Sequence, residues 1–125
     1  MRQAPFGKYL RRIREARQRS DTSFSVRGFA QKVGVAACYI SKVERGDVGP
    51  PSEATIRRMA DVLGEDRDVM LALAGKISSD LREAIVRKPR LFAMLIRQLK
   101  DAPDEQIERV VREAGAEFST GEDAT

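Results

Sequence analysis

Four glycines divide the first 75 residues into short stretches, each with apolar residues at helical spacing. Gly34, Gly46, Gly64 and Gly75 each follow such a stretch directly. Glycine adopts, at no steric cost, the left-handed conformation that commonly closes a helix. The apolar spacing is typical of helices, and almost no pattern indicates a strand. We therefore expect a compact unit built from short helices.

Three polar residues stand where later helices would begin. Ser25, Ser52 and Asp66 can each accept a hydrogen bond from the first free N–H groups of the helix that follows. With a first helix over about 6–18 and a third ending before Gly46, they predict five helices. The apolar residues at helical spacing are Phe6, Leu10 and Ile13 in the first helix, Val26, Phe29, Ala30 and Val33 in the second, Ile56, Met59, Ala60 and Leu63 in the fourth, and Val69, Met70, Leu73 and Ala74 in the fifth.

The third helix lies within GVAACYISKVERG (34–46), and its two sides differ. At about 100° per residue, Ile40 and Val43 fall on one side with Glu44 beside them, so this side is expected to face the core. The outward residues are small or cationic, namely Ala37 at the tip, Cys38, Ser41, Lys42 and Arg45. The helix therefore presents small and cationic groups to a partner.

Positive charge is concentrated in the first part of the chain. Residues 1–75 hold 14 Lys and Arg against 9 Asp and Glu, whereas residues 76–125 hold 9 against 10. The first part is therefore the expected partner of a polyanion. Seven basic residues crowd the first 19 positions, although a solvated helix face would explain that cluster equally well.

Composition excludes several classes of function. The chain has no histidine and one cysteine, Cys38, which excludes Ser-His and Cys-His catalytic pairs, the usual zinc sites and an internal disulfide. No phosphate loop or nucleotide fingerprint is present, so we expect no enzyme, no cofactor and no metal. The N-terminal segment lacks the apolar centre of a signal peptide, and no apolar run approaches the roughly 20 residues of a membrane span. A cytoplasmic protein without a membrane partner is expected.

The segment from Phe29 to Gly64 carries a motif with many positions in order. FAQKVGVAACYISKVERGDVGPPSEATIRRMADVLG resembles the helix-turn-helix of the XRE family, the Cro and cI repressor-like DNA-binding proteins. The matching residues are Phe29, Ala30, Gly34, Val35, Ile40, Ser41, Glu44, Arg45, Gly46, Pro51, Ala60, Leu63 and Gly64. With its flanking helices, the resemblance covers roughly 6–75. It implies an all-α protein with a five-helix lambda-repressor-like DNA-binding domain, in a bacterial or phage setting and associated with the nucleoid.

The resemblance also implies that the helix over 37–45 enters the major groove of double-stranded DNA. Ala37 and Cys38 can pack on thymine methyl groups, and Lys42 and Arg45 can donate to guanine. Ser41 can serve a base or a phosphate. The candidate phosphate contacts are Ser25, Arg27, Tyr39, Arg17 and Arg19.

Departures from the family pattern affect DNA contact rather than the fold. Many members carry glutamine at the start of the second helix, where this chain has Val26. Serine or threonine and then glutamine are common around the start of the third, where it has Ala36, Ala37 and Cys38. Phosphate contact therefore shifts toward Arg27, Arg45 and main-chain N–H groups at helix starts.

Two of the candidate contacts have a second interpretation. Tyr39 can pack between helices instead of reaching a phosphate. Cys38 can act as an oxidation-sensitive switch of DNA binding, although a small groove-facing residue is the simpler interpretation.

Residues 76–114 are predicted to form a separate helical module. One helix is capped near Ser78 or Ser79, Pro89 begins the next, and Pro103 lies in the first turn of a third. The middle helix, RLFAMLIRQLK, is too apolar for one face of an isolated helix. Its candidate dimerisation residues are Leu91, Phe92, Leu95, Ile96 and Leu99. The alternatives are a module that thickens the core or one that binds a regulatory protein.

The sequence thus predicts a DNA-binding domain over 1–75, a dimerisation or interaction module over 76–114, and a disordered tail over 115–125. Such a chain would be a sequence-specific transcriptional regulator, more readily a repressor, that binds a palindromic operator as a homodimer. The competing interpretation is an antitoxin-like or adaptor protein whose main role is to bind another protein.

Overall fold

The computed structural model describes the backbone of residues 4–123 and the side chains of residues 6–115. Every regular element in this part of the chain is helical, which confirms the predicted all-α class. The elements are α1 (Ala4–Gln18), a short 3-10 helix η1 (Thr22–Phe24), α2 (Val26–Val33), α3 (Ala37–Arg45), α4 (Glu53–Leu63), α5 (Arg67–Leu73), α6 (Ser79–Arg87), α7 (Pro89–Leu99) and α8 (Asp104–Asp123).

The chain divides into two compact units, Met1–Arg82 and Glu83–Thr125. The first unit extends past residue 75, where we predicted the boundary, because the start of α6 is tied to α4. The Glu53 carboxylate accepts hydrogen bonds from the Ser79 main-chain N–H at 3.2 Å and from the Ser79 hydroxyl at 3.0 Å. Helix α6 therefore begins in the first unit and ends in the second.

Helix ends in the first unit follow the sequence signals. The side chains of Ser25, Ser52 and Asp66 accept from main-chain N–H groups in the first turns of α2, α4 and α5. The four predicted closing glycines, Gly34, Gly46, Gly64 and Gly75, have φ values of 91°, 80°, 72° and 74°. Short-range sequence chemistry thus fixes where these helices begin and end.

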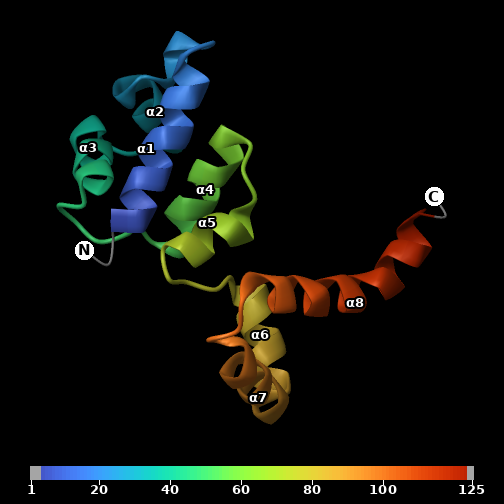
Figure 1. Ribbon diagram of the computed structural model, residues 1–125. Coiled ribbons are helices and arrows are strands. Elements are labelled where there is room, and N and C mark those ends of the chain that lie inside the picture. The colour runs from blue at the N-terminus through green and yellow to red at the C-terminus, as the bar shows by residue number, and fades with distance from the viewer. Residues whose placement is uncertain (1–3, 124–125) are drawn as a thin grey trace. The chain divides into compact units, whose positions relative to one another are not determined.

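The core of the first unit surrounds α1, which lies between α3 on one side and α4 and α5 on the other (Figure 1). Its fully buried large side chains are Phe6, Leu10, Phe29, Ile40, Ile56, Met59, Leu63, Met70 and Leu71. Val69 departs from the expected stripe and is half exposed, because the buried side of the short helix α5 is made by Met70 and Leu71.

Two glycines allow backbones to approach closely. A Cβ atom on Gly7 of α1 would lie 2.5 Å from the Val43 carbonyl oxygen of α3. A Cβ on Gly28 of α2 would collide with the Ser23 backbone. Only glycine fits at either point without moving a neighbouring backbone.

The second unit has little core of its own. From residue 83 to 115, where side chains are described, none is buried. Several of the predicted dimerisation residues of α7 are well exposed: Leu91 at 63%, Ile96 at 53% and Leu95 at 44%. Phe92 and Leu99 are half-buried. The unit therefore leaves an apolar surface uncovered.

Helix α8 continues to Asp123, over most of the stretch for which we predicted a disordered tail (115–125). Gly115 explains the difference, because it lacks the positive φ that closes the helices at Gly34 and Gly75. Without that conformation a glycine weakens a helix but does not end it. Residues 124 and 125 lie outside the described residues.

Candidate nucleic-acid interface

Helix α3 has one buried and one open side, as its sequence pattern predicts. Ile40 and Val43 are buried against the core at 0% and 2% exposure. On the opposite side, Cys38, Lys42 and Arg45 are exposed. Two further candidates, Ala37 and Ser41, are half-buried at the margins of the helix, and Ala37 packs partly against the core.

A buried ion pair fixes α3 to α1. Arg14 donates to both carboxylate oxygens of Glu44, from Nε at 2.7 Å and from Nη2 at 3.0 Å, and both side chains are about 95% buried. Its Nη1 also donates to Gln18 at 3.1 Å and to the Phe24 carbonyl at 3.2 Å. Such a bidentate pair, with both Nη1 donors also satisfied, restricts both distance and orientation. The open side of α3 therefore has a fixed direction relative to α1.

The turn between α2 and α3 is held from α4. Arg58 donates from Nε to the Val33 carbonyl at 3.0 Å, at the last residue of α2. The Gly34 main-chain N–H donates to the Ala30 carbonyl at 2.8 Å, which closes the same helix end. These contacts fix the end of α2, where the turn to α3 begins, and sequence reasoning missed the role of Arg58.

The start of α3 differs from the starts of its neighbours. Ala36 occupies its cap position with an extended backbone (φ −72°, ψ 144°) but provides no side-chain hydrogen bond. By contrast, Ser25, Ser52 and Asp66 cap α2, α4 and α5. The first N–H groups of α3 therefore keep their hydrogen-bonding capacity, at the helix end where the dipole favours negative charge.

Two cations on the open side of α3 differ in their surroundings. Arg45 forms an exposed ion pair with Asp47, with Nε and carboxylate oxygen 2.8 Å apart. Exposed pairs of this kind contribute about 0–1 kcal/mol, so Arg45 can exchange Asp47 for another anion. Lys42 forms no ion pair with any residue whose side chain the structure describes. Its ammonium group is free to act outside the protein.

The predicted phosphate contacts fall into two groups. Arg27, in the first turn of α2, and Arg19, just after α1, are exposed. Ser25 caps α2 through its Oγ, which accepts from the Gly28 N–H at 3.1 Å and leaves its own hydrogen available to donate. Tyr39 is half-buried and packs against the core, as its second interpretation expects.

Arg17 acts mainly within the protein. Its guanidinium donates to the Leu63 carbonyl at the end of α4 and lies over the Phe24 ring, 4.5 Å from the ring centroid. These contacts join α1, η1 and α4. A phosphate contact by Arg17 would have to replace them, so the structure favours a supporting role over the predicted one.

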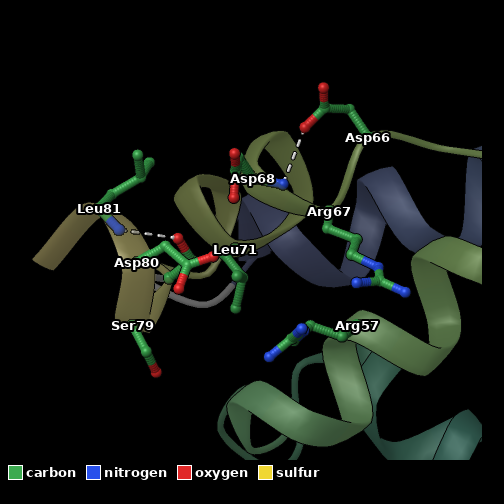
Figure 2. A pocket seen from close by; sticks show the side chains of 9 residues that line it. Arg57, Asp66, Arg67, Asp68, Leu71, Ser79, Asp80 and Leu81 are labelled. Carbon is green, nitrogen blue, oxygen red and sulfur yellow. Dashed lines mark hydrogen bonds between the residues drawn. The ribbon is translucent and has the colours of Figure 1, made fainter. Parts of the chain in front are cut away.

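A hollow of about 420 Å³ lies elsewhere in the first unit, between α4, α5 and the start of α6 (Figure 2). Arg57 of α4 points into it, and Arg67 lines it but is held by Asp61 through two hydrogen bonds of 2.8 Å. Its acidic lining residues are Asp66, Asp68 and Asp80. Because both signs of charge line this hollow, it selects neither an anion nor a cation.

Within the described residues, no cluster of three or more His, Cys, Asp or Glu side chains is arranged to hold a metal ion. None of the described helices combines the length and apolarity needed to cross a membrane. The one thiol, Cys38, is exposed and unpaired.

A five-helix unit with a fixed, outward-facing α3 defines a helix-turn-helix protein, and comparison with known families agrees. The family model described as "Helix-turn-helix domain" matches residues 5–73. The match covers more than half of the chain and contains α1 to α5. The chain therefore belongs to the helix-turn-helix domain family.

Two relatives come from Bacillus subtilis strain 168. The uncharacterized HTH-type transcriptional regulator RghRB is 37% identical over 84 residues, which cover 65% of this chain and 57% of the relative. The HTH-type transcriptional repressor RghR is 36% identical over 72 residues, which cover 58% of this chain and 50% of the relative. The matched segments thus span about half of the length of each relative. No solved structure matches the chain significantly.

Proposed function

We propose that this protein is a DNA-binding transcriptional regulator that inserts α3 into the major groove. The proposal rests on one observation: α3 is held in a fixed orientation with one side open to solvent. Its apolar side is locked by Ile40, Val43 and the Arg14–Glu44 pair, while its small and cationic side is open. An α-helix fits the major groove, and small side chains near its start allow close approach to base edges.

Lys42 is the best placed residue to read a base. It is exposed on the middle of the open side and has no ion-pair partner among the described side chains, so its ammonium group can donate to guanine O6 or N7. Cys38, one turn earlier, supplies a small apolar surface for a thymine methyl. Ala37, at the tip, is half-buried and leaves room for the same kind of contact.

Repression is the favoured outcome of binding. RghR is named a transcriptional repressor, and this chain is 36% identical to it over 72 residues. A compact protein seated on an operator can block polymerase without further machinery. RghRB is named only as a regulator, so its name does not distinguish repression from activation.

Selection from a random DNA pool, followed by fluorescence anisotropy on the selected sequence, tests DNA binding. A protein that contacts 6 to 10 phosphates is expected to lose about three to five decades of affinity between about 50 and 200 mM salt. Lys42→Ala should cost about 1–3 kcal/mol on the selected sequence and relax preference at one base pair. Lys76→Ala, which removes the same charge after α5, is the matched control. Absence of selectable binding by the wild-type protein would rule the proposal out.

The second unit is proposed to pair two copies of the chain. From 83 to 115 it buries no residue, and no described ion pair involves any of these residues. Its charges are segregated around the exposed face of α7: residues 87–100 contain five cations and no acid, and residues 101–108 contain four acids and no cation. Across a two-fold axis the basic stretch of one copy can meet the acidic stretch of the other. A self-complementary surface of this kind favours a second copy over an unrelated partner.

Analytical ultracentrifugation at micromolar concentration tests the pairing. We expect a dimer for the wild type and a monomer for Leu95→Asp, which places a charge on the exposed apolar face of α7. Ala93→Asp, which lies about 160° from Leu95 around the same helix and is exposed, should remain dimeric. A dimer predicts a palindromic operator with half-site centres about 34 Å apart. A monomer that does not pair on DNA would contradict this part of the proposal.

A role as an adaptor or antitoxin-like protein is the second candidate, because the same exposed face could receive another protein. The two candidates differ in what they require of α3. An adaptor would keep its partner when Lys42 is replaced and would show no salt-dependent binding to DNA. The regulator would instead lose DNA affinity when Lys42 is replaced or the salt concentration is raised.

A further inference from the structure

The hollow between α4, α5 and the start of α6 (Figure 2) has no part in the open side of α3. Its volume of about 420 Å³ lies within the range of roughly 300–1,000 Å³ that small-molecule sites in proteins occupy. All of its lining residues lie between 57 and 81, inside the first unit, and none of them is a candidate DNA contact. Three helices therefore form a concavity that the proposed function does not use.

The hollow has an apolar floor. Leu71 of α5 lines it and is fully buried, so this side chain forms the inner wall. Leu81 of α6 also lines it and is 46% exposed. A ligand with a short hydrocarbon chain can cover these two side chains and remove apolar surface from water.

One loosely held cation enters the hollow from α4. Figure 2 shows the Arg57 side chain extending into the space between α4 and the start of α6. Its partner is the Glu53 carboxylate, 3.7 Å from Nη1, and that carboxylate already accepts two hydrogen bonds from Ser79. Exposed pairs of this kind contribute about 0–1 kcal/mol, so Arg57 can turn to the carboxylate of a ligand.

The remaining charge of the lining is negative. Arg67 is already neutralised by two hydrogen bonds to Asp61. Asp66 caps α5 through Oδ1, which accepts from two main-chain N–H groups. Asp68 and Asp80 are exposed, and neither carboxylate forms an ion pair with any side chain that the structure describes. Three carboxylates thus face the single available cation, Arg57.

We infer that this hollow binds a small dipolar molecule of the basic amino acid class. The ligand carboxylate pairs with Arg57, its cationic side-chain end pairs with Asp68 and Asp80, and its methylene groups cover Leu71. A simple anion or cation would satisfy one kind of group and be repelled by the other, whereas a molecule that carries both charges satisfies both. The bound ligand would join α4, α5 and the start of α6. This binding does not depend on the proposed function.

Lysine, norleucine and cadaverine are matched probes for these contacts. Norleucine lacks the side-chain ammonium of lysine, and cadaverine lacks its carboxylate. Each is titrated at constant ionic strength into the isotope-labelled full-length protein while amide chemical shifts are followed by NMR. We expect lysine to shift the amides of residues 57, 68 and 79–81 saturably, with a dissociation constant of about 1–10 mM. Norleucine and cadaverine should bind about five- to tenfold more weakly, because each lacks one charged contact.

Two variants assign the ends of the ligand. Arg57→Gln should weaken lysine binding but not cadaverine binding, because cadaverine has no carboxylate for Arg57 to bind. Asp80→Asn should weaken lysine binding and leave norleucine binding unchanged. Arg87→Gln and Asp101→Asn, which remove the same charges outside the hollow, are the controls and should bind lysine like the wild type. All four positions are exposed, so the fold should tolerate each change.

Three results would overturn the inference. They are equal binding of the three probes, the absence of saturable shifts around the hollow, and unchanged lysine affinity in Arg57→Gln and Asp80→Asn. The titration contains no DNA, so it can succeed or fail whatever the outcome of selection from the DNA pool.

Discussion

Arg14 and Glu44 form a charged contact inside the core, with exposed side-chain fractions of 5% and 6%. A buried pair is costly to break, because the remaining charge has neither water nor a partner. The wheel of α3 had placed Glu44 beside Ile40 on the inward side, and a carboxylate there requires a cation. Which cation it meets could not be predicted, because 30 residues separate the partners along the chain.

The first prediction concerns this pair. Arg14→Met should lower the free energy of unfolding by about 3–5 kcal/mol, because Glu44 is left buried and unpaired. Adding Glu44→Leu should restore a large part of that loss. Urea denaturation followed by circular dichroism measures both variants. Arg11→Met, which breaks only the exposed pair with Glu15, should cost less than about 1 kcal/mol. A loss that small for Arg14→Met would mean that the pair does not hold α3.

At the scale of elements, α3 begins without the side-chain cap that stabilises its neighbours. Ala36 already has the extended conformation of a cap residue, so a capping side chain fits there without rearrangement. Ala36→Ser is therefore expected to raise the free energy of unfolding by about 0.5–2 kcal/mol. Ala36→Asp should stabilise the free protein similarly but weaken DNA binding, because its carboxylate occupies the N–H groups and repels a phosphate. Chemical denaturation and anisotropy measure the two effects. Equal DNA affinity for the two variants would contradict the second.

The start of α6 should respond to acid. Two hydrogen bonds lower the pKa of Glu53 below the ordinary value of 4.5. The larger effect comes from the Ser79 main-chain N–H and the smaller from the Ser79 hydroxyl. Because the pKa of Glu53 is lowered in the folded state, the contact is fully stabilising at pH values above the ordinary pKa. The stabilisation is lost as the pH falls through the lower pKa of the folded state. The Ser79 amide should therefore exchange its hydrogen faster as pH drops below about 4.5, after correction for intrinsic exchange. Glu53→Gln keeps an acceptor but cannot titrate, and a pH response that persists in this variant would assign the effect to another group.

Local signals predicted the elements well, and distant contacts were missed. Ser25, Ser52 and the closing glycines act on backbone within a few residues, so one sequence is enough to find them. Gly7 and Arg58 act on α3 and α2 from other helices, and neither carries a periodic pattern that marks its partner. Arg17 illustrates the same limit. Its partner, the Leu63 carbonyl, lies on another helix, so the sequence alone could not distinguish this supporting arginine from the exposed ones.

For the whole molecule, the division of the chain predicts that the first unit folds independently. Its core lies within residues 6–71, and no described residue beyond 82 is buried. A fragment of residues 1–82 should unfold cooperatively, with a midpoint within a few degrees of that of the full chain at a concentration where the full chain is monomeric. Calorimetry measures the midpoint. A fragment that fails to fold would show that the second unit completes the core.

The exposed thiol on α3 also makes the interface experimentally accessible. Cys38 is the only cysteine of the chain, and it lies on the side of α3 that faces away from Ile40 and Val43. A maleimide fluorophore or a tethered cleavage reagent would therefore attach at one defined point, with no cysteine to be introduced or removed. Quenching of a dye at Cys38, or strand scission from it, would report directly which nucleotides lie next to the helix.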